Sequence, residues 1–147
     1  MRVLKLSIVS LLLAGALATA ACADSSDTGA VATLPTAPST PATVENFSGT
    51  VQVAGSDANP FTVTVSGSTI NLTLTSAGPP ATIFMGFGVG QYLGTTCQLI
   101  SGGFTVIQAG PTPQLSGNIA SGAYCVMVYD AGNMTAPVTY TVVVSHY

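Results

Sequence analysis

The sequence predicts an all-β domain: a two-sheet antiparallel β-sandwich of about eight strands in a jelly-roll-like arrangement. Three observations lead to this prediction. From Phe47 onward apolar residues recur at every second position, the period of a strand with one buried face. Clusters of glycine, proline, aspartate and asparagine separate the alternating runs, as turns do. No stretch long enough for a stable helix keeps a helical period without glycine or threonine.

The alternating runs form a series along the chain. Val51 and Val53 begin it. The later runs are residues 61–65, 70–75, 83–89, 105–108, 114–119, 124–128 and 140–144, of which 105–108 and 114–119 are the weaker candidates. Ser66-Gly67-Ser68 stands between the first two of these later runs, and this turn sequence predicts a hairpin that joins them.

Composition indicates one small domain with a neutral surface. The chain has 147 residues, enough for one domain once its ends are set aside. Hydrophobic residues make up 48% of it and charged residues only 5%, against about 25% charged in ordinary soluble domains. Because the apolar residues alternate with threonine, serine and glycine, we expect an exterior rich in hydroxyl groups.

The few charges exclude one class of function. Arg2 and Lys5 are the only basic residues, and both precede the first apolar run. Nucleic-acid binding depends on cations that neutralise phosphates, so a mature chain without Lys or Arg is excluded from that class. The same absence argues against phosphate-ester substrates and against binding to anionic lipid headgroups. The remaining charges are acidic: Asp24, Asp27, Glu45, Asp57 and Asp130.

Residues 1–21 are predicted to be a signal peptide, with Arg2 and Lys5 before a short apolar helical segment. The small residues directly before Cys22 resemble the lipobox of bacterial lipoproteins. That resemblance implies a lipid on Cys22, which becomes the mature N-terminus of an outer-membrane or other cell-envelope lipoprotein. The alternative is ordinary cleavage after Ala23, which would leave a secreted or periplasmic protein.

A Ser/Thr/Pro-rich segment, residues 22–46, is predicted to be a flexible, disordered tether. Pro35, Pro38 and Pro41 are evenly spaced in it, and it holds few apolar side chains to bury. Its reach is about 25 Å as a coil and about 60 Å if extended. A long tether suits a chain whose end is fixed to a membrane. The predicted sandwich domain then covers residues 47–147.

Cys97 and Cys125 are predicted to form a disulfide, since both lie in strand-like runs of an exported chain. Closing a loop of about 28 residues should stabilise the fold by about 3–4 kcal/mol. Cys125 has the opposite parity to Tyr124 and Val126. We therefore expect the bridge to tie segments on the outer side of the sandwich and not to cross the core.

The C-terminal third resembles a known family. The run Ser121-Gly122-Ala123-Tyr124-Cys125-Val126-Met127-Val128-Tyr129-Asp130, followed by Val138-Thr139-Tyr140-Thr141-Val142, is similar to the bacterial pre-peptidase C-terminal domain. Phe61-Thr62-Val63 and Leu72-Thr73-Leu74 resemble its earlier strands. The resemblance covers residues 49–145 and implies a jelly-roll-like sandwich of secreted proteins. It supplies no catalytic residues.

No residue set in the chain predicts an enzyme. The only histidine, His146, stands next to the C-terminus, and we expect it to be a solvated residue just past the last strand. Glu45, Asp57 and Asp130 lie in different turns and share no apolar setting for acid–base catalysis. A reactive thiolate needs a neighbouring cation, and the mature chain has none. No cofactor is expected either.

Two kinds of ligand site remain as alternatives. Asp130 with Asn133, and Asp57 with Asn59, could contribute to a weak calcium site, although Asp and Asn at such positions more often shape tight turns. Zinc is not expected, because too few His and Cys residues are present. Tyr92 and Tyr129 are the tyrosines that could form an exposed platform for a sugar.

These features support two hypotheses of function. The first is a non-enzymatic exported envelope protein, a surface lipoprotein that acts as a structural or protein-interaction module. The second is an accessory module, tethered or secreted, that binds carbohydrate or calcium. The first is preferred, because reactive groups are absent and aromatic side chains are few.

Overall fold

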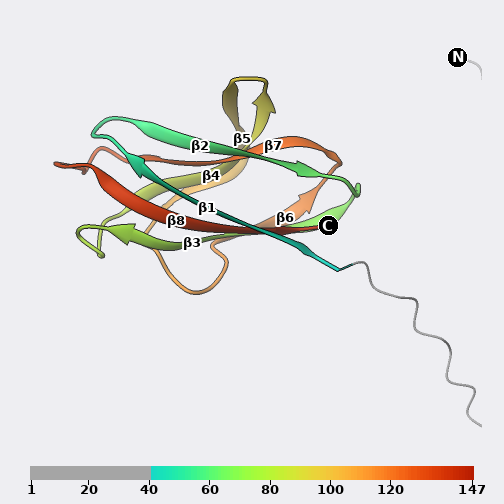
Figure 1. The fold of residues 1–147 in the computed structure, drawn as a ribbon, viewed down its shortest axis with the longest axis horizontal. Coiled ribbons are helices and arrows are strands. Elements are labelled where there is room, and N and C mark those ends of the chain that lie inside the picture. The colour runs from blue at the N-terminus through green and yellow to red at the C-terminus, as the bar shows by residue number, and fades with distance from the viewer. Residues whose placement is uncertain (1–40) are drawn as a thin grey trace, which may run out of the picture. The chain divides into compact units, whose positions relative to one another are not determined.

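The computed structural model describes residues 41–147 (Figure 1). The predicted signal peptide, Cys22 and most of the predicted tether lie outside the described residues. The strands are β1 (Thr43–Val51), β2 (Ser56–Val63), β3 (Ser68–Gly78), β4 (Met85–Leu93), β5 (Thr96–Ile107), β6 (Leu115–Ile119), β7 (Gly122–Asp130) and β8 (Val138–His146). In this part of the chain no helix is long and apolar enough to cross a membrane.

The strands form two antiparallel sheets packed face to face. One sheet has the order β1-β8-β3-β6 and the other β2-β7-β4-β5. The first strand thus pairs with the last, the second with the seventh, the third with the sixth and the fourth with the fifth. This nested pairing is the jelly roll, so the predicted fold class is confirmed.

The core forms from the inward-facing side chains of both sheets. β7 contributes Tyr124, Val126 and Val128, and β8 contributes Val138, Tyr140, Val142 and Val144, all of them buried. Leu72 and Leu74 of β3 belong to the same hydrophobic cluster as Met85 and Phe87 of β4. The period-two pattern of these strands is therefore the pattern of one buried face per strand, as expected.

The predicted hairpin between residues 61–65 and 70–75 is wrong. β2 pairs with β7, whereas β3 pairs with β8 and β6, so the two strands lie in different sheets. Their buried side chains face one another across the core. Gly67, at a φ of 74°, lies where the chain crosses from one sheet to the other. Among the described strands, only β4 and β5 are consecutive and paired.

The first strand begins at Thr43, earlier than the predicted domain start at Phe47. Thr43 pairs with His146 and Val44 with Ser145, so the start of this strand is set by the far end of the chain. Val53, expected in a strand, lies in the turn after β1 and is about half exposed.

The disulfide joins Cys97 of β5 to Cys125 of β7, with a Cα–Cα distance of 5.8 Å. Both strands belong to one sheet, so the prediction that the bridge does not cross the core is confirmed. β4 lies between them, and its Gly90 pairs with Cys125. A Cβ at Gly90 would lie 3.0 Å from the Cys97 sulfur. The bridge therefore needs a glycine at this position of β4.

Candidate functional site

The sandwich has two long edges, and they differ in chemistry. At one, the outermost strands β1 and β2 face each other; at the other, β5 faces β6. The acidic residues of 41–147 are Glu45 on β1, Asp57 on β2 and Asp130 at the end of β7. Asp130 accepts a hydrogen bond from the backbone N–H of Ala54, in the turn between β1 and β2. All three carboxylates therefore belong to the β1/β2 side, and β5 and β6 carry none.

A buried tyrosine closes the β1/β2 edge. The Tyr140 hydroxyl, on β8, donates to Oδ2 of Asp57 at 2.9 Å and accepts from Nδ2 of Asn59 at 2.8 Å. Asp57 and Asn59 are on β2, so these bonds join one sheet to the other. Burial and the neighbouring Asp57 carboxylate raise the pKa of Tyr140 well above its ordinary value. Gly49 of β1 lies against this network, because a Cβ there would meet Asp57 and the Tyr140 hydroxyl.

His146 is buried, and the prediction of a solvated terminal residue is wrong. It is the last residue of β8 and 2% exposed. Its Nε2 lies 2.9 Å from Oε1 of Glu45, and its ring centroid lies 5.5 Å from that of Phe61. The pairing of Thr43 with His146 carries the last strand to this position. The imidazole is thus held in the fold beside one carboxylate.

The candidate calcium residues take part in structural hydrogen bonds. Oδ1 of Asp130 accepts from the backbone N–H groups of Gly132, Asn133 and Met134. These bonds and the one from Ala54, which is the largest cause, hold the pKa of Asp130 below its usual value. An aspartate that accepts from backbone N–H groups two to four residues ahead stabilises a tight turn, which is the alternative to a calcium site. Within residues 41–147, no three His, Cys, Asp or Glu side chains gather as a metal site would require.

The two candidate platform tyrosines lie apart. Tyr129 of β7 pairs with Gly86 of β4, and its ring lies against that glycine, where a Cβ would collide with it. Tyr92 lies further along β4, opposite Cys97. Six residues of strand span about 20 Å, so the fold does not bring these two rings into one platform.

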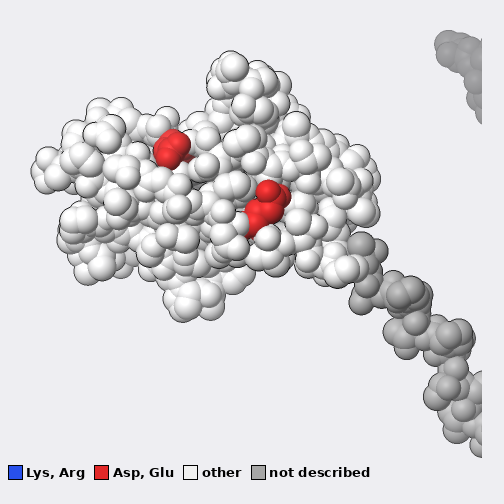
Figure 2. All heavy atoms as spheres, in the orientation of Figure 1, with Lys and Arg blue, Asp and Glu red and all other residues white. Residues whose placement is uncertain are grey.

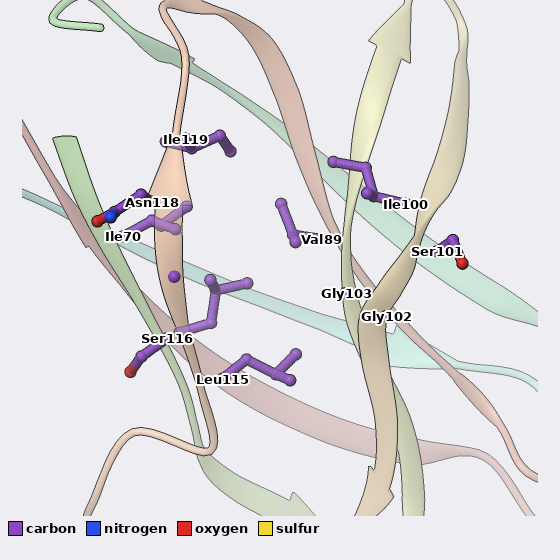
Figure 3. Close-up of a pocket in the computed structure, with 12 residues that line it drawn as sticks. Ile70, Val89, Ile100, Ser101, Gly102, Gly103, Leu115, Ser116, Asn118 and Ile119 are labelled. Carbon is purple, nitrogen blue, oxygen red and sulfur yellow. The ribbon is translucent and has the colours of Figure 1, made fainter. Parts of the chain in front are cut away.

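The β5/β6 edge is open and apolar. A cleft of about 220 Å³ lies between the two strands (Figure 3). Figure 3 shows Leu115 and Ile119 of β6 pointing into the gap, toward Val89 of β4 and Ile100 of β5, whereas Ser116 and Asn118 point away from it. Ile70 and Leu72 of β3 also line it. None of its lining residues is charged.

Glycine leaves the cleft empty. Gly117 lies between Leu115 and Ile119 on the same side of β6, and a Cβ built on it would meet nothing within 4 Å. On the opposite wall, Gly102 has a φ of 78°, which suits a residue without a side chain. The β4–β5 register also shifts between Gly88 and Gly90. The cleft is therefore bordered by two residues without a side chain and by an irregular stretch of the β4–β5 pairing.

The sequence pattern does not predict this cleft. Alternation predicts only a weak strand over residues 114–119 and no element over residues 99–103. One signal was available: in Leu115-Ser116-Gly117-Asn118-Ile119 the central inward position of an alternating run is a glycine. Such a position indicates a gap or a close approach. Which of the two applies depends on the strand packed opposite, and the sequence does not identify that strand.

Charge is sparse on the visible face of the domain. Figure 2 shows two separate acidic spots and no basic group on the described residues of that face. Large apolar side chains are exposed elsewhere on β4, β5 and their surroundings: Phe84 at 50%, Leu93 at 58%, Phe104 at 49% and Val106 at 52%. Phe104 and Val106 are on β5, so the strand that forms one wall of the cleft also exposes apolar side chains on its outer side.

Comparison with known proteins gives structural neighbours but no family. No protein-family model matches the chain, and no curated protein matches it. Two solved structures resemble it: PliG from Aeromonas hydrophila, at 19% identity and a TM-score of 0.49, and PliG from Salmonella Typhimurium, at 13% and 0.45. The likeness covers 71% of this chain in both cases, and 86% and 87% of the respective neighbours. Both are described as periplasmic inhibitors of g-type lysozyme. That description concerns the two inhibitors.

Proposed function

We propose that this chain is a non-enzymatic, exported cell-envelope protein that acts through contacts with a partner protein at the cleft between β5 and β6. The observation that carries the proposal is the contrast between this edge and the opposite one. The β1/β2 edge is closed by hydrogen bonds from the buried Tyr140 to the half-buried Asp57 and Asn59, whereas the β5/β6 edge exposes an uncharged apolar gap. A concave site lined mainly by apolar side chains is a common place for a ligand or partner to bind.

The side chains that could do chemistry support a non-enzymatic role. His146 is buried against Glu45 and Phe61. The Asp57 carboxylate accepts from Tyr140, and that of Asp130 from backbone N–H groups. Each of these groups has a partner that stabilises the fold. No pair of them shares a pocket where a substrate could bind.

The membrane anchor is a second part of the proposal. A lipid on Cys22 would hold the chain at the envelope, and the segment between Cys22 and β1 would let the domain reach about 25–60 Å from the membrane. Mass spectrometry of the mature N-terminus tests this. We expect an acylated Cys22, and Cys22→Ser should release the protein into the soluble fraction. An unmodified chain that begins at Asp24 would show ordinary cleavage after Ala23.

Site-specific photo-crosslinking in intact cells tests the interaction cleft. A photoreactive residue at Ser101, an exposed residue of β5 beside the cleft, should give a discrete adduct with an envelope protein. The same residue at Thr50, exposed on β1 at the opposite edge, is the matched control and should give none. Gly117→Leu, which fills the cleft, should abolish the Ser101 adduct. Equal adducts from both positions, or none from Ser101, would contradict the proposed contact site.

A further inference from the structure

The free edge of β6, beside the cleft, has no neighbouring strand. β6 pairs with β3 on one side only, and it is the last strand of its sheet. An edge strand carries unpaired N–H and C=O groups on its free side. β6 is also short, from Leu115 to Ile119, and uncharged. No lysine, proline or inward-pointing charge protects it from pairing with another strand.

The backbone directly next to β6 on the same edge is capped. Beyond β6, β3 continues to Gly78. At Leu74 of β3 the side-chain amide of Gln114 makes the hydrogen bonds that a neighbouring strand would make. Its Oε1 accepts from the Leu74 N–H at 2.7 Å, and its Nε2 donates to the Leu74 carbonyl at 3.4 Å. Gly110 donates a further bond to that carbonyl. Exposed backbone on this edge is therefore capped next to β6 and left uncapped along it.

The opposite edge of the sandwich is protected in a different way. Pro60, which lacks an N–H, lies in β2, and Asp57 of that strand reaches inward to Tyr140. Proline and inward-pointing charges are devices that prevent an edge from accepting another strand. β2 has both of them and β6 has neither, so the two edges differ in their capacity to accept a strand.

The gap at Gly117 matches one apolar side chain. An engineered apolar cavity of about 150 Å³ accommodates benzene, so a cleft of about 220 Å³ has room for a branched aliphatic or aromatic side chain. In a strand added beside β6, every second side chain would point toward the core. A residue placed beside Gly117 would then enter the space that the glycine leaves.

Charge determines which strands fit. β5, β6 and the lining of the cleft contain no charged residue, and the three carboxylates of the described chain belong to the other edge. A lysine or glutamate buried at this position would have no partner, and an unpaired buried charge is costly. The complementary occupant is an uncharged strand with an apolar central residue.

We infer that the cleft accepts an extended, uncharged segment of a partner polypeptide, which adds as a strand to β6 and places one apolar side chain beside Gly117. This inference rests on the proposed function and specifies how the partner binds. It uses β-strand addition, in which backbone hydrogen bonds give affinity and a side-chain pocket gives specificity. A free lipid or a small apolar molecule could fill the gap but would leave the edge backbone unpaired.

A tethered strand tests this inference directly. Asn71 of β3 pairs with Ser145 on one side and with Ser116 on the other, so the end of β8 lies two strand spacings, about 10 Å, from β6. A Gly/Ser linker of about ten residues after Tyr147 spans that distance and keeps the fused strand at a high effective concentration. The fused strand alternates threonine and valine around a central leucine. The matched control differs only in having lysine at that centre.

The leucine fusion should melt about 5–10 °C above the lysine fusion, and the β6 amides should exchange about tenfold more slowly in it. Gly117→Leu should remove both differences, because the introduced side chain occupies the gap. Equal melting temperatures with unprotected β6 amides would overturn the inference. So would protection on β1 in place of β6, or concentration-dependent dimers in sedimentation that account for the protection, since these would assign the edge to a second copy.

The outcome separates this inference from the proposed function. If Gly117→Leu abolishes the Ser101 adduct in cells but the fused leucine strand leaves β6 unprotected, the cleft is a contact site and the occupant is not a strand. If Gly117→Leu does not change the Ser101 adduct and the fused leucine strand does not protect β6, both the proposed site and the proposed mode of binding are wrong. Protection that is lost when a fatty acid is added would assign the gap to a lipid and overturn the peptide inference.

Discussion

The two long edges of this sandwich show how one fold can be closed on one side and open on the other. At the β1/β2 edge, Tyr140 reaches past Gly49 and binds Asp57 and Asn59 of the facing sheet. At the β5/β6 edge, Gly117 occupies the corresponding kind of inward position, and nothing fills its space. Each edge contains a glycine, but one glycine makes room for a side chain of the protein itself. The other leaves room for something else.

The largest expected effect concerns the strand that forms one wall of the open edge. Replacing both Cys97 and Cys125 with serine should lower the free energy of unfolding by about 3–4 kcal/mol, because it removes the constraint on the unfolded chain. Since the bridge holds β5 to β7, amide exchange should accelerate more in β5 than in β1. Chemical denaturation and hydrogen exchange measure both effects. Equal acceleration at the two edges would show that the disulfide stabilises the whole domain and not its open side.

The substitutions Gly49→Ala at the closed edge and Gly117→Ala at the open edge form a matched pair. Of the two, Gly49→Ala should destabilise the domain. Its Cβ would lie 2.8 Å from the Tyr140 hydroxyl and closer still to the Asp57 carboxylate. Overpacking of this kind costs about 1–3 kcal/mol. Thermal or urea denaturation measures the loss. If the variant is as stable as the wild type, the side chains of Tyr140 and Asp57 can shift to accept the added Cβ at little cost.

Removing the hydroxyl that closes the β1/β2 edge should have a somewhat smaller effect. Tyr140→Phe leaves Asp57 and Asn59 without a partner and should cost about 1–2 kcal/mol. The folded pKa of Tyr140 is raised above its ordinary value of 10.0. Its contribution is therefore fully present below pH 10 and is lost as the pH rises further, when the unfolded chain ionises first. Between pH 10 and 12 the wild type should lose stability more steeply than Tyr140→Phe, and parallel curves would contradict this assignment.

The smallest effect is expected at the open edge, and it has the opposite sign. Gly117→Ala meets no atom within 4 Å and reduces the conformational freedom of the unfolded chain. It should raise stability by about 0.5–1 kcal/mol. Asn118→Ala, on the same strand but pointing away from the cleft, is the control and should not stabilise. A destabilised Gly117→Ala would mean that the cleft is narrower than its geometry indicates.

The sequence predicted the central strands better than the edges, and the reason is physical. β7 and β8 each pair on both sides, and their inner faces are fully buried, so Tyr124, Val126, Val142 and Val144 follow a clear alternation. β6 pairs on one side only and interrupts its own pattern with Gly117. A weak pattern is the expected signature of an edge strand that borders an opening.

Alternation identifies which face of a strand is buried but not which strand lies beside it. For this reason the turn at Gly67 was interpreted as a hairpin, although it connects the two sheets. His146 was missed for the same reason: its burial depends on pairing with Thr43, about a hundred residues earlier in the chain. The open cleft shows the same limit, because its walls are β5 and β6, which follow one another in the chain but belong to different sheets.

The nested pairing of strands has a consequence for how such a chain can be exported. β1 has β8 as its only sheet partner, and β2 has β7, so the first half of the domain has no place to pair until the second half has been synthesised. Folds dominated by such distant pairings form slowly. If the proposed signal peptide directs export, the chain would remain unfolded until nearly all of it has been made. Slow folding of this kind would keep the new polypeptide extended, so that it can still pass through a narrow translocation channel.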